Sequence, residues 1–600
     1  MSQPIKPLEE IAEQWFVNRQ EHLDYFWKWG NNIPAPGNSS VAFAGLRRTG
    51  KTAILHRVFN RLFNEQDVVI PVFITFEQYL YRPKMITIRE FAVHYFTSYV
   101  RSYLAFTYRR PDLHQTQANL SELQKLAEEM QDKVVLPLIA NYDLQVADKS
   151  NPFGATDLAA WLINMPKGQA AIREMPTAVF IDEFQILADV HDPDNDRVVP
   201  LTNYYQKPSE SMVAPMVVSG SSVSILFGRA TGGALSGRLR YRFLDPLDPS
   251  FAMLLVTRLC QHRNIPVDYV FAYAILQLTQ GYPYAIESLV NSESPAAEHY
   301  PNINALDEVV RFELIHPRGQ LFKHYNEEFH KYSKLLNDGQ TTKKVMFWAT
   351  QYPEQRIPVK EVAAKIGVKP QEVQESLQKL EELDIVHRVS LSVFEGPTEP
   401  MLRRFITYQY DFEIQELAKE QAAKNIELEV RSELRRMTNI MGHFAEIVVG
   451  AVMKGFDGRI LDGPSYFSTS APVPVPNIHK IENRWGVIEG GDQKELDLIG
   501  EYQGYDEEAE VFTRNAWFVQ VKYRNNKVTS TDVQRFFEQI HAIKDVRGYD
   551  EVTPWYVSKA GYFEPAKKLL EEEGIYYTDL QQFNDLADAF GYLGFPAKSR

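Results

Sequence analysis

Two groups of residues in this chain have types and spacings suited to phosphate chemistry. The first is GLRRTGKT at 45–52, where Gly45 and Gly50 bracket a turn that Lys51 and Thr52 follow. A glycine-rich turn that opens a helix presents backbone N–H groups to an anion, so this spacing predicts a phosphate-binding loop. Lys51 would reach the β- and γ-phosphates of ATP, and the Thr52 hydroxyl would hold Mg²⁺. A chance turn followed by a lysine is the alternative.

The second group is Asp497, Gln520 and Lys522, which alternate with apolar residues in ELDLIG and WFVQVKY. On a strand, Gln520 and Lys522 share one face, and Asp497 on an adjacent strand could join them. The oxygens of Asp497 and Gln520 suit Mg²⁺, with Mn²⁺ as a second choice. Lys522 would offset charge that builds on a scissile phosphate. A solvated polar strand face is the alternative interpretation.

Acids at the end of a strand would complete an ATP site. In AVFIDE at 178–183, four apolar residues precede Asp182 and Glu183. We assign Asp182 to Mg²⁺ and Glu183 to the general base that activates water; an ordinary acid-capped strand end is the alternative. The next apolar run, MVVSGSS, places Ser219 and Ser221 where they would either sense the γ-phosphate or cap a helix.

The elements that position the first group follow an alternating pattern. The apolar runs VAFAG, VVIPVFITF, TAVFID and APMVVSG alternate with helical stretches up to about residue 245, which predicts a parallel sheet with crossover helices. The stretch 84–172 is expected to be a mostly helical insertion between the second and third strands. Residues 246–335 have only helical patterns, and the stretch from about 425 to 600 becomes strand-rich.

Composition narrows the class of protein. The formal net charge of −14 argues against a chain that coats nucleic acid along its whole surface, but a local basic groove remains compatible with it. The single cysteine, Cys260, precludes an internal disulfide and predicts a cytoplasmic protein. No apolar run is long enough to span a bilayer, and the first residues lack a signal-peptide pattern, so no membrane partner is expected.

Several short motifs resemble, in the same order, those of the archaeal-type ATPases, a branch of P-loop proteins related to AAA+ and STAND ATPases. The resemblance covers about residues 10–290 and rests on the following motifs: FVNRQEHL at 16–23, the doubled arginine of the loop, FIDE at 180–183, GRLR at 237–240 and GYP at 281–283.

This resemblance implies roles for four more residues. Arg19 would lie beside the adenine, and Arg47 would belong to the loop signature. Arg238 would sense phosphate in its own or a neighbouring subunit, and Pro283 would lie near the base. A surface ion pair for Arg19 and a plain helix start at Pro283 are the alternatives. His22 stands where the family usually has an acid.

Residues 343–350, 359–366 and 371–383 have helical patterns, and VHRVSLSVF follows them like a hairpin wing. This looks like a winged helix-turn-helix, as expected after this ATPase type. The third helix carries several acids and is a poor neighbour for DNA phosphates, which favours a structural or subunit-contact role over sequence-specific DNA reading. These acids are Glu372, Glu375, Glu381 and Glu382.

The C-terminal motifs are similar to the PD-(D/E)xK phosphodiesterase fold, in particular its Mrr-like restriction-endonuclease branch, which has Gln in the E-x-K element. GHFAEI at 442–447 resembles the opening helix, whose acid, Glu446, would point into the site, and 566–580 resembles the closing segment. Because Gln520 is neutral, the site would need Glu446 or Glu495 as an extra ligand, or it would be weak.

Together these patterns predict a multidomain α/β chain with four parts. They are a P-loop ATPase core at 1–245, a helical lid at 246–335, a winged-helix domain and linker at 336–424, and a nuclease-like domain at 425–600. The expected function is an ATPase switch or motor that controls a Mg²⁺-dependent DNA endonuclease, with DNA and further copies of the chain as partners, in genome defence or mobile-element control. The alternative is a STAND-like switch or DNA-remodelling ATPase whose last domain binds DNA or a protein partner without cutting.

Overall fold

The computed structural model describes most of the chain as two compact units. The first unit is Met1–Pro246, Tyr282–Ala285 and Glu313–Lys424, and the second is Leu247–Gly281, Ile286–Phe312 and Asn425–Arg600. The described residues are 6–35, 38–46, 48–80, 85–147, 154–220, 235, 237–266, 269–333, 340–353, 355–382, 385–390, 393–415, 417–439, 444–489, 492–506, 511–524, 526–592 and 595. Among these residues, no helix has both the length and the apolar character to cross a membrane.

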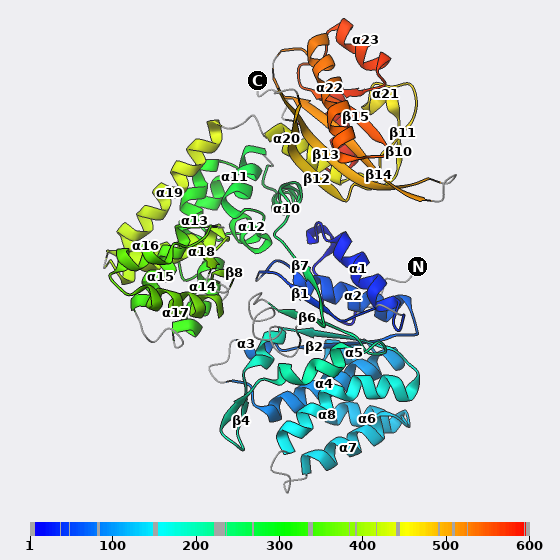
Figure 1. Ribbon diagram of the computed structural model, residues 1–600, viewed down its shortest axis with the longest axis vertical. Coiled ribbons are helices and arrows are strands. Elements are labelled where there is room, and N and C mark those ends of the chain that lie inside the picture. The colour runs from blue at the N-terminus through cyan, green and yellow to red at the C-terminus, as the bar shows by residue number, and fades with distance from the viewer. Residues whose placement is uncertain are drawn as a thin grey trace. The chain divides into compact units, whose positions relative to one another are not determined.

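The first unit is built on a five-stranded parallel sheet with the order β2-β3-β6-β1-β7 (Figure 1). The strands are β1 (Val41–Ala44), β2 (Ile70–Thr75), β3 (Thr177–Asp182), β6 (Met216–Gly220) and β7 (Arg240–Phe243). The first four are the predicted apolar runs. β7 reads RYRF and was not expected, because an edge strand with two arginines has no apolar run. Since all five strands are parallel, the loops after β1, β3 and β6 meet at one edge of the sheet.

Helices surround this sheet. α1 (Gln20–Asn31) precedes β1, α2 (Lys51–Glu65) follows it, and the short α3 (Glu77–Leu80) follows β2. Five more helices fill the stretch between β2 and β3, as the helical pattern of that stretch predicts: α4 (Ile88–Thr107), α5 (Asp112–Gln115), α6 (Leu120–Glu129), α7 (Val135–Ala147) and α8 (Gly154–Arg173). The long α4 begins at a capping box formed by Thr87 and Glu90.

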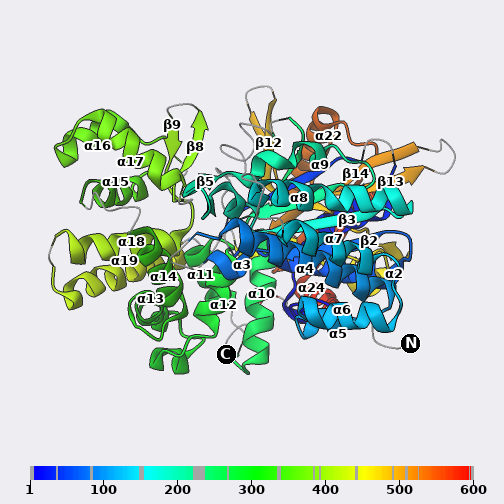
Figure 2. The ribbon, with the colours of Figure 1, turned by 90° about the horizontal axis from the view of Figure 1, so that it is seen from below.

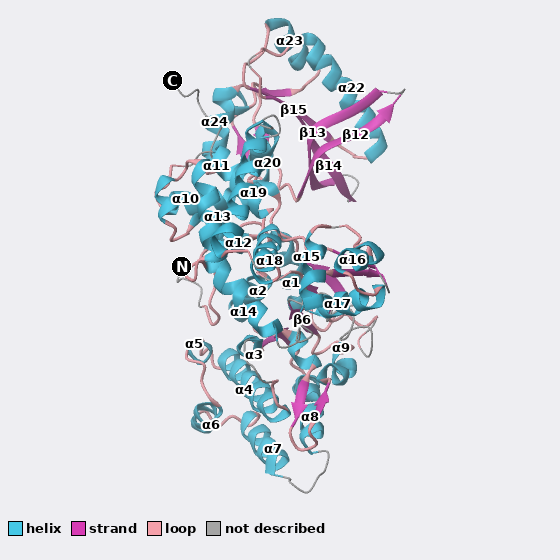
Figure 3. Cartoon of the chain, turned by 90° about the vertical axis from the view of Figure 1, so that its left-hand side faces the viewer, coloured by secondary structure: helices cyan, strands magenta, loops and turns pink. Residues whose placement is uncertain are grey.

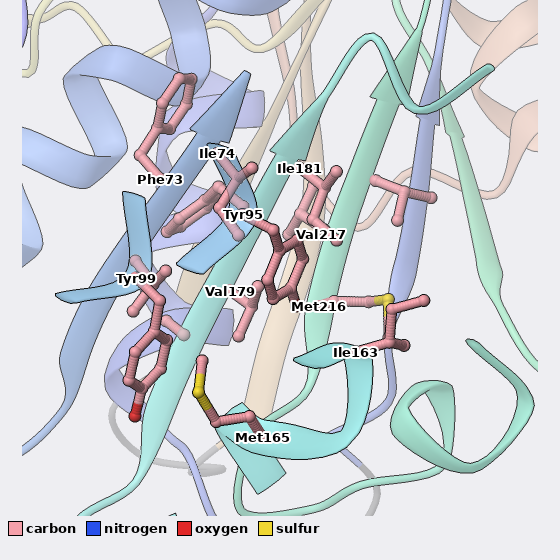
Figure 4. Packing of buried hydrophobic residues seen from close by; sticks show 14 of the residues in the cluster. Phe73, Ile74, Tyr95, Tyr99, Ile163, Met165, Val179, Ile181, Met216 and Val217 are labelled. Atoms are coloured by element: carbon pink, nitrogen blue, oxygen red, sulfur yellow. The ribbon is translucent and has the colours of Figure 1, made fainter. Parts of the chain in front are cut away.

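Part of the buried core of the first unit lies between the sheet and this helical insertion, and residues of α1 and α2 belong to the same cluster. α4 packs against β2 and α8, and Figure 4 shows Tyr95 and Tyr99 of α4 beside apolar side chains of the strands. Ile163 and Met165 of α8 belong to the same buried cluster. A short hairpin of β4 (Val190–Asp192) and β5 (Arg197–Val199) and the helix α9 (Gln206–Ser209) lie between β3 and β6 along the chain.

The remaining part of the first unit contains three helices and a hairpin that share one buried core. These are α15 (Gln340–Thr350), α16 (Val359–Ile366), α17 (Pro370–Glu382), β8 (His387–Ser390) and β9 (Val393–Glu395), grouped together in Figure 2. Their order is the one expected for a winged helix, and that assignment stays a prediction. α14 (Gln320–Ser333) and α18 (Pro400–Glu413) flank this group along the chain.

The second unit contains a mixed five-stranded sheet in chain order. Its strands are β12 (Lys480–Glu489), β13 (Asp492–Asp506), β14 (Val511–Lys522), β15 (Val552–Ser558) and β16 (Tyr576–Thr578). β12, β13 and β14 are antiparallel, whereas β15 and β16 run parallel to β14. The switch to parallel pairing requires a crossover, which α22 (Ser530–Arg547) provides.

Helices cover both faces of this sheet. The adjacent residues Trp517 and Phe518 of β14 point to opposite faces. Trp517 packs edge-on against Phe456, just after α20 (Phe444–Lys454), whereas Phe518 shares a core with Phe536 of α22. Figure 3 shows α22 running alongside β12 and β13.

The other elements of this part of the chain are β10 (Ile460–Leu461), α21 (Gly463–Tyr466), β11 (Val473–Pro474), α23 (Glu564–Glu572) and α24 (Leu580–Ala589). The helices α10 (Pro249–His262), α11 (Tyr269–Thr279), α12 (Pro283–Val290), α13 (Leu306–Ile315) and α19 (Lys419–Asn439) precede α20. Boundaries between the two units fall within α12, α13 and α19, and the predicted domain limits at 246, 336 and 425 stay predictions.

Candidate functional site

The predicted phosphate loop connects a buried strand directly to a helix N-terminus. β1 ends at Ala44 and α2 begins at Lys51, with Gly50 as its N-cap at a φ of 101°, a backbone region that favours glycine. A Cβ on Gly45 would lie 2.6 Å from the carbonyl oxygen of Leu244, so the close approach of these two segments also requires glycine. A five-stranded parallel sheet with this turn after the interior strand β1 is the architecture of a P-loop nucleotide-binding fold.

Lys51 lies across the loop that it follows. Its ammonium donates hydrogen bonds to the carbonyl oxygens of Gly45 at 2.7 Å and Leu46 at 2.8 Å. The residue is only 6% exposed. The loop therefore holds one positive charge in its concave side, beside the N-terminus of α2, and both features favour an anion there.

Asp182 is the centre of a hydrogen-bonded group at the carboxyl edge of the sheet. The hydroxyl of Thr52 donates to Asp182 Oδ2 at 2.7 Å, and the hydroxyl of Ser219 donates to Asp182 Oδ1. Asp182 is 1% exposed and Ser219 is fully buried. The parallel register explains this meeting, because β3 and β6 are neighbours and Asp182 and Ser219 stand near their ends. Ser219 thus contacts the acid of the neighbouring strand, whereas Ser221 lies outside the described residues.

The predicted general base, Glu183, leaves the strand in a left-handed conformation. Its φ and ψ are 56° and 41°, and a residue other than glycine in this region is strained. Its carboxylate accepts a hydrogen bond from the side-chain amide of Gln185. The turn therefore places Glu183 directly after Asp182 at the sheet edge, where a water-activating base is expected.

Arg19 supports the phosphate loop from outside. The residue is 8% exposed, and its guanidinium donates to the carbonyl oxygens of Thr49 at 3.2 Å and Asp245 at 2.9 Å. Its position is therefore not that of a surface ion pair, and the contact with adenine stays a prediction. Nearby, burial lowers the pKa of His22 to about 4, helped by the charges of Arg242 and Arg19, so this imidazole is neutral at pH 7.

The remaining residues of the first predicted site occupy different surroundings. Arg238 donates to Glu210 at 2.7 Å in a partly exposed ion pair, and its role toward phosphate stays a prediction. Pro283 is the first residue of α12, so the plain helix-start interpretation and the nucleotide role are both compatible with its place. Arg47 lies outside the described residues. Its neighbour Arg48 places its guanidinium carbon 3.7 Å from the centroid of the Tyr284 ring.

In the second unit, the strands separate at the predicted metal site. The ladder between β13 and β14 ends at the pair Leu498–Val519. Immediately beyond it, the backbone N–H of Val521 donates to Asp497 Oδ2 at 2.7 Å, and the Gln520 side-chain amide donates to the same oxygen. The structure therefore brings Asp497 and Gln520 into contact, as the strand alternation predicts.

The surroundings of the Asp497 carboxylate disfavour its charged form. Burial raises the pKa of Asp497 to about 6, and the nearby Glu446 charge adds to the shift. The Val521 amide and the charges of Lys522 and Arg484 oppose it. Lys522 is half-buried at the end of β14, opposite Ser558 of β15. Its ammonium makes no hydrogen bond or ion pair with the residues that the structure describes.

Glu446 is only 7% exposed and pairs with an arginine that the sequence did not single out. Arg484 of β12 donates to both carboxylate oxygens of Glu446, at 2.8 and 3.0 Å. The strand pattern of this segment could have suggested an edge strand, but nothing in it indicates that one arginine meets a glutamate of α20. Glu495 lies opposite Gly486 of β12, beside the same region.

The donor set fits a hard divalent cation in part. The buried Oε1 of Gln520 has no hydrogen-bond donor among the described residues, so it is an acceptor without a partner. Asp497 Oδ1 likewise accepts none from the described part of the chain, and both are oxygen ligands of the kind Mg²⁺ prefers. Within the described ranges, however, no cluster of three or more His, Cys, Asp or Glu residues is arranged to hold a metal. The site therefore offers two oxygens, one from the Asp497 carboxylate and one from the Gln520 amide, and a third candidate ligand, the Glu446 carboxylate, is engaged by Arg484.

Comparisons with known proteins give only distant similarity. No protein-family model matches the sequence, and no curated protein matches it. One similar solved structure is the Walker-type ATPase paby2304 of Pyrococcus abyssi, with 12% identity, 66% of this chain and 98% of that chain covered, and a TM-score of 0.43. Another is the Aeropyrum pernix ORC1 protein in complex with DNA, with 13% identity, 69% and 93% covered, and a TM-score of 0.31. The Thermotoga maritima RuvB Holliday junction branch migration motor has 11% identity, 64% and 92% covered, and a TM-score of 0.28. Similarities this weak carry no argument about function, which must come from the residues of this chain.

Proposed function

We propose that this protein is an ATPase whose nucleotide state controls a metal-dependent DNA endonuclease in its second unit. The observation that supports the ATPase part of this proposal is the hydrogen bond from Thr52 to Asp182 at 2.7 Å, between residues 130 positions apart in the sequence. It brings the hydroxyl after the phosphate loop to the acid of the neighbouring strand end. Together with the buried Lys51, this is the set of groups that ATP and Mg²⁺ require.

Each residue at the first site then has a chemical role. The N–H groups at the start of α2 and the Lys51 ammonium receive the phosphates, and the oxygens of Thr52 and Asp182 would hold Mg²⁺. When bound, Mg²⁺ would neutralise charge that develops on the phosphates. Glu183 accepts the proton of the attacking water. Ser219 orients the Asp182 carboxylate, and Arg238, from the same chain or a second copy, responds to the γ-phosphate.

The second site supports cleavage of a phosphodiester. We infer that the oxygens of Asp497 and Gln520 hold Mg²⁺ or Mn²⁺, and that the Lys522 ammonium offsets charge on the scissile phosphate. The metal, when bound, would supply Lewis-acid stabilisation of that charge. The order of α20, three antiparallel strands, α22 and β15 supports a PD-(D/E)xK-like domain. DNA is the proposed substrate, and genome defence or mobile-element control is the proposed setting, by the resemblance of its motifs.

A second candidate function is favoured by one observation. Among the described residues, the C-terminal site has no preformed group of three acidic or imidazole ligands, and Arg484 already pairs with Glu446. A nucleotide switch or DNA-remodelling ATPase whose second unit binds DNA or a protein partner without cutting would need no such group.

A parallel cleavage assay tests both halves. Wild type, Lys51→Ala and Lys522→Ala are incubated with DNA, ATP and Mg²⁺ or Mn²⁺, with Lys480→Ala of β12 as the control for loss of a lysine from the same sheet. We expect Lys51→Ala to abolish ATP hydrolysis and the ATP dependence of cleavage. Lys522→Ala should abolish cleavage and retain ATP hydrolysis, and Lys480→Ala should behave as wild type.

The same assay separates the alternatives. Unchanged cleavage by Lys522→Ala would refute the nuclease assignment. DNA binding without cutting under either metal would support the switch. DNA-stimulated ATP turnover without strand scission would support the remodelling ATPase.

A further inference from the structure

Arg484 lies among the carboxylates of the second site. Its side chain is 45% exposed, and the Glu446 side chain that it grips with two hydrogen bonds is 9% exposed. In the pairing of β12 with β13, Asp497 and Glu495 lie opposite Arg484 and the nearby Gly486. Arg484 thus contacts one carboxylate, that of Glu446, and lies near the charges of two others. Negative charge of this kind also attracts a divalent cation.

The backbone of Arg484 is strained in a way that its neighbours are not. Its φ is 51°, although it lies in the middle of β12. The pairing of β12 with β13 puts Arg484 directly opposite Asp497, because the residues on either side of each are register partners. A left-handed residue inside a strand costs free energy unless its side chain is glycine or something holds it there. The two hydrogen bonds to Glu446 are the interaction that holds it.

We propose that Arg484 is a built-in competitor for the divalent cation, and that metal binding at Asp497 and Gln520 requires its guanidinium to leave Glu446. This inference rests on the proposed metal site and adds a residue that regulates metal binding there. With Arg484 in place, the carboxylate charges are offset and Glu446 is engaged. Once Arg484 leaves, its backbone can relax to an extended strand, and the Glu446 carboxylate becomes available as a third oxygen ligand.

The size of the effect follows from charge. A guanidinium a few ångströms from a bound cation repels it, and this repulsion is only partly screened at a half-buried site. Removal of the guanidinium also releases a carboxylate toward the cation. We expect Mn²⁺ affinity to rise about tenfold when Arg484 is neutralised, as the combined result of the two effects.

The test is Mn²⁺ binding to the full chain without nucleotide, measured by calorimetry and by the electron paramagnetic resonance signal of unbound Mn²⁺. Arg484→Gln should bind Mn²⁺ about tenfold more tightly than wild type. Arg484→Gly should do the same, and because glycine accepts the left-handed backbone, this variant guards against misfolding. Arg514→Gln is the matched control: Arg514 is 50% exposed and pairs with Glu501, 7% exposed, on the same sheet. It should bind as wild type.

Asp497→Asn separates this inference from the proposed metal site. If it removes Mn²⁺ binding while both Arg484 variants keep the wild-type affinity, the role of Arg484 is overturned and the metal site stands. If Asp497→Asn changes nothing in wild type or in Arg484→Gln, the metal site is wrong and the inference falls with it. Tighter binding in both Arg484 variants, lost again on adding Glu446→Gln, would support the proposal.

Discussion

The buried carboxylate of Asp497 should contribute less to the stability of the second unit at neutral pH than at acidic pH. Burial raises its pKa to about 6, above the ordinary 3.8. A raised pKa means that the folded state holds the proton more tightly than the unfolded state. The stabilisation of the folded state by this tighter proton binding is fully present below about pH 4, and it is lost as the pH rises through about 6. A shift of about 2 units corresponds to about 3 kcal/mol.

Asp497→Asn should remove this pH dependence. Asparagine cannot ionise, and its side-chain oxygen can still accept from the Val521 amide and from Gln520. We expect the variant to be more stable than wild type at pH 8, by up to about 3 kcal/mol, and the difference to vanish near pH 4. Hydrogen exchange of the β13 and β14 amides between pH 4 and 8 measures the local free energy of opening without requiring two-state unfolding of the whole chain.

Glu501 of the same strand provides a control of opposite sign. Burial alone would raise its pKa, but the Tyr549 hydroxyl and the Arg514 guanidinium outweigh burial and hold the pKa below its ordinary value. Its stabilisation is therefore present at neutral pH and lost as the pH falls. Glu501→Gln should lower amide protection at pH 7. If Asp497→Asn instead destabilised β13 and β14 at pH 8, or gained as much at pH 4 as at pH 8, the reasoning from burial would be refuted.

Three other changes have defined outcomes. Gly45→Ala should destabilise the first unit by roughly 1–3 kcal/mol in thermal unfolding, because the new Cβ would meet the Leu244 carbonyl. Gly168→Ala is the control: this glycine lies in α8 with open space at the Cβ position, so the change should stabilise the unit by about 0.5–1 kcal/mol. Equal effects of the two would contradict this. Ser219→Ala should lower the rate of ATP hydrolysis about tenfold with little change in ATP affinity, since Asp182 loses one donor; an unchanged rate would remove Ser219 from the site. Chelation of divalent cations should stop ATP hydrolysis and DNA cleavage together, and metal-independent cleavage would exclude the proposed nuclease.

Local sequence patterns were enough to predict much of the fold. The strands β1, β2, β3 and β6 were predictable because each is a continuous apolar run, as a strand buried on both faces must be. β7 was not, because an edge strand with arginines at two of its four positions has no such signal. Gln520 and Lys522 alternate with apolar residues, and this predicted that the two share one face of a strand, since side chains repeat every two residues.

What the sequence by itself determined is the set of groups able to do chemistry and the short elements that carry them. The spacing from Gly45 to Thr52 and the acids after a buried strand are local, so a few neighbouring residues specify them. Only the tertiary structure decided which distant groups meet. Ser219 reaches Asp182 because β6 lies beside β3, and Arg484 reaches Glu446 because an edge strand passes the start of α20. Strand order and helix packing are set by the whole core, and no local pattern encodes them.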